Sequence, residues 1–450
     1  MRTSVIAIGL VALTVGAAAP AAGQGLIFDA RRIGMGGLTL GRSASLVRYN
    51  PAYRAVADQA DQADRRGRPR VTIPIPLGII QFLHDHPHLS TDPAFHPDSA
   101  RFNPIVAVNT VLNLPIYLEV KKAPTPSNDV VVDIGQNALR ANLGLSAELV
   151  PGDELGIGGS SRPLDPGIGI KGVRVSMMGW LHDEVGLQLG DKLLGFLRDS
   201  QPASNTTAYT VNGDGILEGG VAPSVAYAGR IAGDATTGFY VGGAVHYYLG
   251  VAYARTSATG GFVTGNPIFG GPVKPSLAAV TDYSKAGNSV GHGVGGDVGV
   301  AWVSGPIELG VGVNDIGATL TWSDTRQDTL RYDTTSNTIR TTPGPNHFTT
   351  KTKLPVSYIA NVAYVIGLTT LGADVLNNGR GTTIHVGGEQ RLGLFALRGG
   401  VARDQRKRIE FGWGGGVRLG PLGLDVGFWT HTNSLSNERG VTMATSFSIY

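Results

Sequence analysis

The chain contains no cysteine among its 450 residues. This absence excludes a disulfide framework, a thiolate metal site and a lipid anchor on an N-terminal cysteine. Long hydrophobic runs are also missing, because no segment reaches the ~20 uninterrupted apolar residues that a membrane-spanning helix requires. The sequence therefore excludes an α-helical membrane protein and a lipoprotein.

The chain also lacks a strong net charge of either sign. The 37 lysines and arginines nearly balance the 34 aspartates and glutamates, the formal net charge is +3, and the basic residues are scattered. This pattern indicates no nucleic-acid-binding surface. Glycine, by contrast, is abundant at 66 residues, and apolar residues recur throughout the chain. The composition favours a folded chain with many turns over a disordered one.

The N-terminus predicts export. Arg2 precedes the apolar stretch Val5–Val15, which is followed by the small residues of Ala17–Gly23. A basic residue, a short apolar core and a run of small residues are the parts of a secretory signal peptide. We therefore expect residues 1–23 to be a signal peptide, cleaved after Gly23 or close to it.

The last hundred residues alternate between apolar and polar positions. In Arg408–Leu419, for example, Phe411 and Trp413 fall on one face of an extended strand, whereas Glu410 falls on the other. The same alternation repeats through strand after strand, with short glycine-rich turns between them. A sheet with one apolar and one polar face is typical of a barrel that has lipid outside and water inside. The sequence thus predicts an all-β fold, a transmembrane antiparallel β-barrel of about 14 strands.

The strand pattern is clearest in the final third of the chain. The strands predicted there are Leu354–Gly367, Thr369–Leu376, Thr382–Arg391, Phe395–Ala402, Arg408–Leu419, Leu422–His431 and Val441–Tyr450. Earlier strands are predicted at Arg70–Ile80, Asn103–Leu112, Pro115–Lys121, Asn137–Val150, Glu154–Ser160, Gly167–Met178, Ile216–Arg230, Phe239–Arg255, Ser289–Val303, Ile307–Asn314 and Ala318–Trp322.

Two kinds of segment interrupt this pattern. Glu184–Arg198 spaces its leucines at helical intervals and is predicted to form a helix between strands. Gln201–Asp214, Thr256–Gly287 and Ser323–Lys351 are rich in Thr, Ser, Asn, Pro and Gly and are predicted to be long loops. Long loops at one rim and short turns at the other are typical of outer-membrane barrels.

Short motifs at both ends of the chain give a family resemblance. Ala30–Gly37 (ARRIGMGG) is followed by Tyr49–Ala52 (YNPA). The C-terminal half adds, in order, Val313–Gly317, Lys353–Pro355, His385–Glu389 and Ala396–Gly400. In these motifs the chain resembles the FadL-like superfamily of outer-membrane barrels, which includes long-chain fatty-acid transporters and PorV-type barrels of the type IX secretion system.

The resemblance implies an N-terminal plug over residues 24–64 and a transmembrane barrel over residues 65–450. It implies passive transport of hydrophobic or amphipathic small molecules across the outer membrane of a Gram-negative bacterium, with no cofactor. The alternative is a PorV-like scaffold or shuttle that holds an extracellular or secreted protein partner and transports no solute. The implied plug and gate residues are Gly34, Gly36, Gly37, Asn50, Pro51 and Ala52.

Alternation directs a set of charged side chains in the C-terminal strands toward the polar face. The lumen-lining residues predicted in this way are Asp374, His385, Glu389, Arg391, Arg398, Glu410, Arg418 and Asp425. They either line a solute path or pair with one another and seal the barrel. Sealing is the favoured interpretation, because pairing offsets the cost of confining charges in a poorly solvated interior.

The sequence predicts no enzyme. No serine–histidine pairing rises above chance, and hydrolysis needs a nucleophile beside a positioned base. His84, His86 and His88 are the best metal candidates, since imidazole suits zinc, copper or nickel, but a solvated loop explains them better and we expect no metal. The expected partners are outer-membrane lipid and a hydrophobic small molecule, with no nucleic acid.

Overall fold

The computed structural model describes residues 29–40, 48–59, 71–75, 84, 129–134, 137–142, 154–193, 206–234, 236–264, 274–284, 290–336, 338–405, 409–432 and 439–449. The predicted signal peptide and the strands predicted at Asn103–Leu112 and Pro115–Lys121 lie outside these ranges. Two helices, α2 (Ala30–Gly34) and α4 (Tyr53–Gln59), are assigned in the N-terminal part. None of the described helices is long and apolar enough to cross a membrane.

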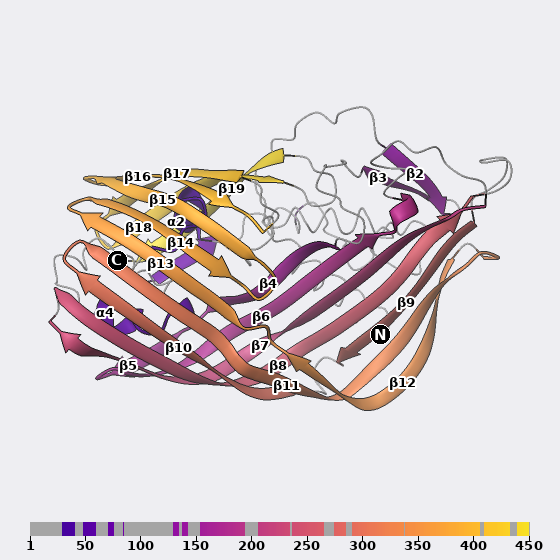
Figure 1. Cartoon of the computed structure of the whole chain (residues 1–450), viewed down its shortest axis with the longest axis horizontal. Coiled ribbons are helices and arrows are strands. Elements are labelled where there is room, and N and C mark those ends of the chain that lie inside the picture. Colours follow the sequence, from indigo (N-terminus) through magenta and orange to yellow (C-terminus); the bar gives the residue numbers. More distant parts are fainter. Residues whose placement is uncertain are drawn as a thin grey trace.

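One antiparallel sheet of seventeen strands makes up most of the molecule (Figure 1). Its strands are β1 (Val71–Ile75), β4 (Glu154–Leu164), β5 (Gly167–Ile170), β6 (Val173–Leu189), β7 (Ala208–Gly233), β8 (Thr237–Val263), β9 (Lys274–Ser284), β10 (Gly291–Ser304), β11 (Ile307–Asp333), β12 (Thr338–Lys353), β13 (Ser357–Ile366), β14 (Thr369–Asn377), β15 (Thr382–Leu392), β16 (Phe395–Arg403), β17 (Ile409–Leu419), β18 (Leu422–Thr432) and β19 (Arg439–Ile449). A separate hairpin pairs β2 (Asp129–Ile134) with β3 (Asn137–Asn142).

The strand pairings match the predicted barrel. β4 and β5 lie end to end along β6, β9 and β10 lie end to end between β8 and β11, and β12 and β13 lie end to end along β11. The seventeen strands therefore occupy fourteen positions across the sheet. β19 pairs with β18 on one side and with β1 on the other, so the first and last described strands of this sheet are neighbours. The predicted all-β, antiparallel barrel architecture is confirmed.

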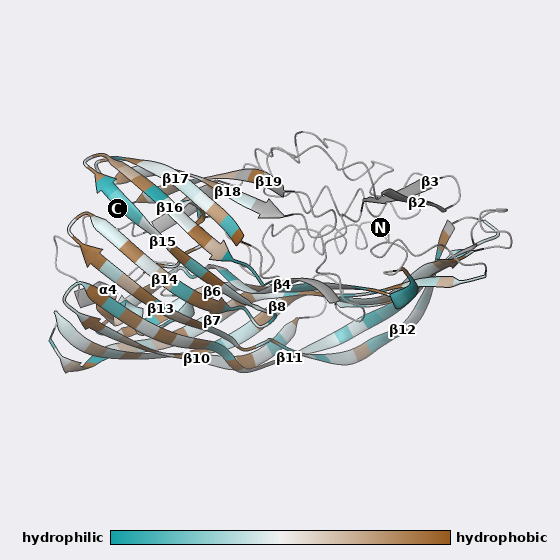
Figure 2. Cartoon of the chain, turned by 45° about the horizontal axis from the view of Figure 1, so that its top comes forward, coloured by the Kyte–Doolittle hydropathy of each residue, from teal (hydrophilic) through white to brown (hydrophobic). Residues whose placement is uncertain are grey.

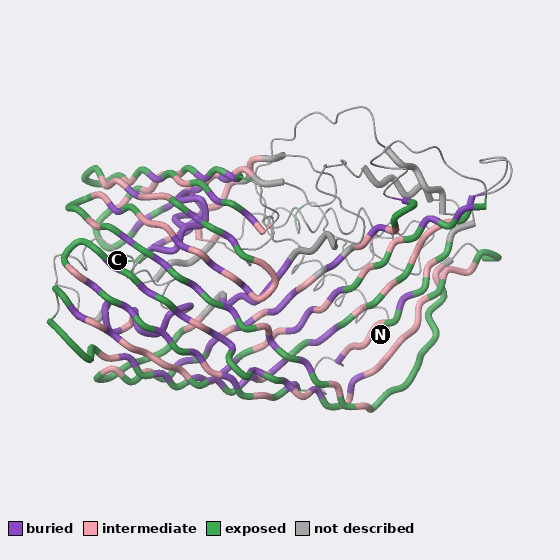
Figure 3. The backbone as a smooth tube through the Cα atoms, viewed as in Figure 1, coloured by how far each residue is buried: buried purple, intermediate pink, exposed green. Residues whose placement is uncertain are grey.

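The two faces of the sheet invert the usual order of a soluble protein. In β15, the apolar side chains of Ile384 and Val386 are 40% and 55% exposed, whereas His385 and Glu389 on the opposite face are 0% and 4% exposed. Buried and exposed residues alternate in this way along most strands (Figure 3). Apolar side chains point outward and charged side chains inward, which is the arrangement of a wall with lipid outside.

The wall has two heights. Strands β13 to β19, which we call the short wall, contain 9–11 residues each. β7, β8 and β11 contain 26–27 residues, and together with β9 and β12 they form what we call the extended wall. At a rise of ~3.3 Å per residue, these lengths correspond to about 35 Å and about 90 Å. Figure 1 shows the long strands continuing well past the end of the short wall.

The extended wall corrects the prediction of three long loops. Within Thr256–Gly287 and Ser323–Lys351, β8 continues to Val263, β9 follows, and β11 pairs with β12 up to Asp333 and Thr338. Within Gln201–Asp214, β7 already begins at Ala208. The loop prediction was wrong because these threonine-rich strands carry no clear apolar alternation, although threonine favours extended backbone. In β12, residues 340–347 are even exposed on both faces. Figure 2 shows β12 as largely hydrophilic, in contrast to the brown-striped β13 and β14.

The helix predicted at Glu184–Arg198 is also wrong. Residues up to Leu189 continue β6, and Glu184 pairs with Ile216 of β7. Only residues 191–193 are helical, and residues 194–198 lie outside the described part. Val185, Leu187 and Leu189 alternate with polar neighbours as well as fitting a helical spacing. Pairing with β7 satisfies the backbone hydrogen bonds, so the strand prevails over the helical pattern.

Candidate functional site

The N-terminal segment, defined here as residues 29–40 and 48–59, packs against the inner face of the sheet. α2 contacts β16, β17, β18 and β19, whereas α4 contacts β7, β8 and β10. The two helices therefore rest on different parts of the wall (Figure 1). Asp29 caps α2, because its side chain accepts a hydrogen bond from the Arg31 backbone N–H at 3.0 Å.

Asn50, Pro51 and Ala52 form a fixed turn before α4. The Asn50 side chain accepts a hydrogen bond from the Ala52 N–H at 3.0 Å, and its amide donates to the Val300 carbonyl of β10 at 3.0 Å. Asn50 and Ala52 are fully buried. A Cβ on Gly299 would lie 2.1 Å from Asn50 Oδ1, so only glycine at this wall position admits the turn. Asparagine is thus required for its amide and not only for its turn propensity.

Gly34 and Gly36 lie where the backbone of the segment touches the backbone of the short wall, and Gly37 follows them with a φ of +87°. A Cβ on Gly400 of β16 would lie 2.0 Å from the Met35 carbonyl oxygen, and one on Gly412 of β17 would lie 2.4 Å from the Gly36 nitrogen. Gly36 itself has a φ of +69°, which a side chain would strain. The glycine cluster therefore serves close packing between segment and wall.

A buried charge cluster joins α2 to the short wall. The Arg31 guanidinium donates to both oxygens of Glu389, at 2.8 Å from Nε and 3.0 Å from Nη2. Arg398 bridges Glu389 and Asp425, with 2.7 Å to each carboxylate. Arg391 adds a fourth ion pair, with 3.1 Å from its Nε to Glu389. These charge-assisted, partly bidentate contacts satisfy charges that would be costly to bury alone.

The remaining predicted lumen residues lie on the same inner face. Asp374 accepts a hydrogen bond from the Thr39 backbone N–H at 2.6 Å and also contacts His385 Nδ1. Glu410 is buried, and Arg418 is half-buried and donates to the Gly420 carbonyl at 3.1 Å. Most of the eight residues thus pair with one another or with the N-terminal segment.

Of the three histidines considered as metal ligands, only His84 lies in the described part of the chain. His84 is exposed, and His86 and His88 lie outside the described ranges. Across those ranges, no group of three or more metal-ligating side chains is close enough to hold an ion.

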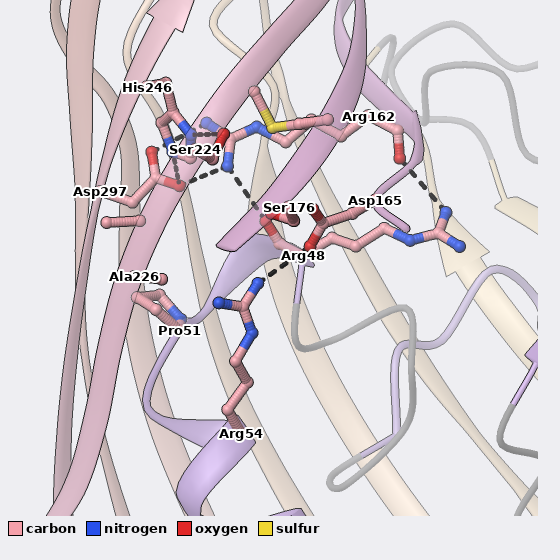
Figure 4. Close-up of a pocket in the computed structure, with 12 residues that line it drawn as sticks. Arg48, Pro51, Arg54, Arg162, Asp165, Ser176, Ser224, Ala226, His246 and Asp297 are labelled. Atoms are coloured by element: carbon pink, nitrogen blue, oxygen red, sulfur yellow. Dashed lines mark hydrogen bonds and ion pairs between the residues drawn. The ribbon is translucent and has the colours of Figure 1, made fainter. Parts of the chain in front are cut away.

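A narrow pocket lies between the N-terminal segment and β4, β6, β7, β8 and β10 (Figure 4). It is lined by Arg48, Pro51, Arg54, Arg162, Asp165, Ser176, Met178, Ser224, Ala226, Ala244, His246 and Asp297. Its free space is about 10 Å³, on the order of a single water molecule. Pro51, one of the predicted gate residues, forms part of this lining, so a larger molecule requires the segment to shift.

Arg162 is the centre of a second charge cluster beside this pocket. It pairs with Asp297 of β10, with 2.8 Å from Nη2 to Oδ1, and its Nη2 also lies 2.8 Å from Asp315 of β11. The Tyr248 hydroxyl donates to Asp315 at 2.5 Å. Alternation predicts that such residues face inward, but no sequence pattern indicates that these four strands meet at one arginine.

Ser224, His246 and Asp297 form a linear chain that sequence reasoning missed. Ser224 Oγ lies 2.6 Å from His246 Nδ1, and His246 Nε2 lies 2.7 Å from Asp297. Two features oppose a nucleophilic role for this trio. Both oxygens of Asp297 are engaged by Arg162, and the Ser224 hydroxyl also lies 2.9 Å from the Ala222 carbonyl, as a donor to it. The trio ties β7, β8 and β10 together and orients the partner of Arg162.

Sequence reasoning also overlooked a G-x-S-x-G pattern at Gly287–Gly291 (GNSVG). In hydrolases this motif sits on a turn from a strand into a helix. Here it lies between β9 and β10 of an antiparallel sheet, and residues 285–289 are outside the described part. The motif therefore lacks the structural context of a nucleophile.

An aromatic cluster covers the inner face next to the pocket. Trp180 meets Tyr248 edge to face at a ring separation of 5.5 Å, and Tyr253 stacks on Trp322 at 5.2 Å. Met178 belongs both to this cluster and to the pocket lining. The cluster is completed by Ala222, Ala318, Leu320 and Leu354. All of these side chains are at most 5% exposed, so the cluster is a packed apolar core on the inner face. Barrel interiors are usually polar, which makes such a core an unusual feature.

Comparisons with known proteins give weak similarities. No protein-family model and no curated protein matches the chain. Among solved structures, the toluene transporter TodX of Pseudomonas putida shares 10% identity over 68% of this chain and 92% of its own, with a TM-score of 0.30. The monoaromatic hydrocarbon channel CymD shares 12% identity over 66% of this chain and 88% of its own, with a TM-score of 0.32. Similarities this low carry no argument about function.

Proposed function

We propose that the protein is an outer-membrane barrel through which hydrophobic or amphipathic small molecules pass, with its N-terminal segment as the plug. The observation that carries this proposal is the aromatic cluster on the inner face, directly beside the pocket under Pro51. A barrel that passed only water-soluble solutes would not need an apolar core on its inner face. An apolar solute would find partners there for its own apolar area.

The outer face supports the location. Exposed apolar side chains recur on every strand of the short wall, among them Leu371, Phe411 and Leu424. Water around this surface would be unfavourable, whereas a lipid bilayer matches it. We propose residues 1–23 as the signal peptide, 24–64 as the plug and 65–450 as the barrel of a Gram-negative outer-membrane protein that uses no cofactor.

In the proposed mechanism, the solute first enters beside Trp180 and Trp322, which are buried in this structure and must move apart to admit it. It then displaces the turn at Asn50, Pro51 and Ala52, which closes the pocket in this structure. Arg31 and Glu389 hold the other half of the plug and limit how far it moves. No energy source is required, because the solute moves down its own gradient.

The experiment is uptake of a labelled long-chain fatty acid by lipid vesicles that contain the purified barrel, compared with protein-free vesicles. The Glu389→Gln variant, which weakens the contact of the plug with the wall, should take up the solute severalfold faster than the wild type. Arg340→Gln, on an exposed arginine of β12, is the matched control and should equal the wild type. The proposal would be wrong if the folded wild type, Glu389→Gln and Arg340→Gln all took up the solute no faster than protein-free vesicles.

The extended wall favours a second candidate function, the scaffold or shuttle that binds a protein. β12 is long and hydrophilic, and its residues 340–347 are all exposed, which suits contact with a protein or glycan better than with an apolar solute. If no variant transports a solute, this wall becomes the surface on which to seek a partner.

A further inference from the structure

The outer face of the sheet changes from apolar to polar at the same level on three neighbouring strand positions. The last exposed apolar side chains are Val294 on β10, Ile316 on β11 and Val356 directly before β13, with exposed fractions of 55%, 42% and 41%. Closer to the short turns, each of these strands carries further exposed apolar side chains on the same face. In the other direction, toward the extended wall, the side chains on this face become polar.

The register of the strands places the polar side chains in two adjacent rows. Thr319 and Thr321 of β11 are the middle members of these rows, with β10 on one side and β12 on the other. The first row consists of Val294, Thr319 and Lys353, and the second consists of His292, Thr321 and Lys351. Two lysines of β12 therefore lie directly beside the end of the apolar surface.

Lys351 and Lys353 both point outward. Thr352, between them, is buried on the inner face, where its hydroxyl accepts a hydrogen bond from the Trp322 indole at 2.9 Å. Successive side chains of a strand point to opposite faces, and both lysines are exposed. Positions two apart on a strand are separated by about 7 Å, so the two flexible ammonium groups can reach one small anion.

No carboxylate neutralises the two lysines within the described part of the chain. Neither ammonium forms an ion pair with another described residue. Asp324, the acidic residue nearest to Thr321 along β11, is engaged by His347. The site thus combines two positive charges and two threonine hydroxyls with an adjoining apolar surface, which suits a molecule that is both anionic and apolar.

We propose, on the basis of the proposed outer-membrane location, that Lys351 and Lys353 bind the phosphate of an acidic lipid. Lysine is a common ligand of phosphate, and the hydroxyls of Thr319 and Thr321 can donate to the same oxygens. The acyl chains lie along the apolar surface that ends at Val294, Ile316 and Val356. Because the site lies at the end of the strands away from the short turns, the lipid belongs to the outer leaflet.

Titration calorimetry on the purified full-length barrel in a non-ionic detergent tests this with dioctanoyl phosphatidic acid and with dioctanoylglycerol, which lacks the phosphate. The wild type should bind the phosphatidic acid about thirtyfold more tightly, the factor expected for two lysines near an acidic headgroup. The double variant Lys351→Gln, Lys353→Gln should lose most of this preference, with dioctanoylglycerol binding unchanged. Inorganic phosphate should bind roughly a hundredfold more weakly than phosphatidic acid, because it has no chains to cover the apolar surface.

The matched control is the double variant Arg331→Gln, Arg340→Gln, which removes the same amount of charge. These exposed arginines are paired across β11 and β12, and Arg340 lies about 35 Å of extended strand away from Lys351. The control should bind both lipids as the wild type does. Thr321→Arg, which adds a cation beside Lys351, should bind phosphatidic acid more tightly than the wild type, a gain that misfolding cannot produce.

Three results would overturn the inference and leave the proposed outer-membrane location intact. The first is equal affinity of the wild type for the two lipids, since the phosphate would then contribute nothing. The second is an equal loss of phosphatidic acid binding in the arginine control, since net charge alone would explain it. The third is binding of inorganic phosphate as tight as that of phosphatidic acid. Binding of neither lipid to the wild type would overturn both this inference and the proposed location.

Discussion

The short wall and the extended wall share one hydrogen-bonding pattern but meet different surroundings. In β15 of the short wall, Ile384 is 40% exposed and its neighbour His385 is fully buried. In β12 of the extended wall, residues 340–347 are all exposed, with no alternation. Alternation in a sequence therefore reports a difference between the two faces of a strand and not the presence of the strand itself.

The same contrast separates two kinds of ion pair. Arg31 and Glu389 are both almost fully buried, whereas the Arg340 side chain, which pairs with Asp333 at 2.5 Å, is 69% exposed. A buried charge left without its partner is expensive, but an exposed one is solvated by water. The two ion pairs have similar distances, but breaking the buried pair would lower the free energy of unfolding more than breaking the exposed pair.

The largest expected effect comes from Glu389→Gln. The change leaves Arg31 and Arg398 with a neutral partner inside the barrel, and breaking a buried pair costs about 3–5 kcal/mol. Urea-induced unfolding of the barrel in lipid vesicles measures this free energy. Arg340→Gln, the matched change on the extended wall, should leave the unfolding curve in place. If the two variants lost equal stability, the distinction between the two walls would be wrong.

The second effect tests the outer faces. Leu424→Arg on the short wall places a charge where we infer lipid, which should cost about 2–4 kcal/mol near the membrane midplane. Thr341→Arg on the extended wall should stay within about 0.5 kcal/mol of the wild type, as for an ordinary surface substitution. The fraction of folded barrel after dilution from urea into vesicles gives both values. A loss at Thr341 as large as that at Leu424 would place lipid along the extended wall as well.

The smallest effect compares two neighbours within β16. Gly400→Ala would place a Cβ 2.0 Å from the Met35 carbonyl oxygen, whereas a Cβ at Gly399 meets nothing within 4 Å. Forcing an extra methyl into a packed contact typically costs about 1–3 kcal/mol. Gly400→Ala should therefore lower stability and speed amide exchange at Gly36, and Gly399→Ala should do neither. Unchanged exchange in Gly400→Ala would mean that the N-terminal segment does not rest on this wall.

The sequence alone predicted the strands of the short wall, because the two faces of this wall differ in polarity and successive residues therefore alternate between apolar and polar. The strand predicted at Phe395–Ala402 is β16, Phe395–Arg403, and the one predicted at Thr382–Arg391 is β15, Thr382–Leu392. It failed for β12, where both faces meet similar surroundings, and for the end of β6, where helical and extended spacings both fit.

For the candidate site, alternation gave the face of each charged residue but not its partner. It placed Glu389 inside, yet the contact with Arg31 spans 358 residues and leaves no local trace. The trio of Ser224, His246 and Asp297 is drawn from three strands in the same way. Asn50, Pro51 and Ala52 were singled out by resemblance, and their role as a gate stays a prediction.

The pairing of β1 with β19 sets an order on folding. Val71 lies opposite Ile449, so this seam forms only after nearly the whole chain has been synthesised. The N-terminal segment leaves the ribosome first, yet the wall that receives Arg31 is among the last parts to be made. Contacts between residues so far apart in the chain offset the entropy lost in closing the loop only late in folding. Folding that depends on such contacts is slow. In a chain of this design, the earliest residues therefore stay without their final contacts until the latest strands have folded.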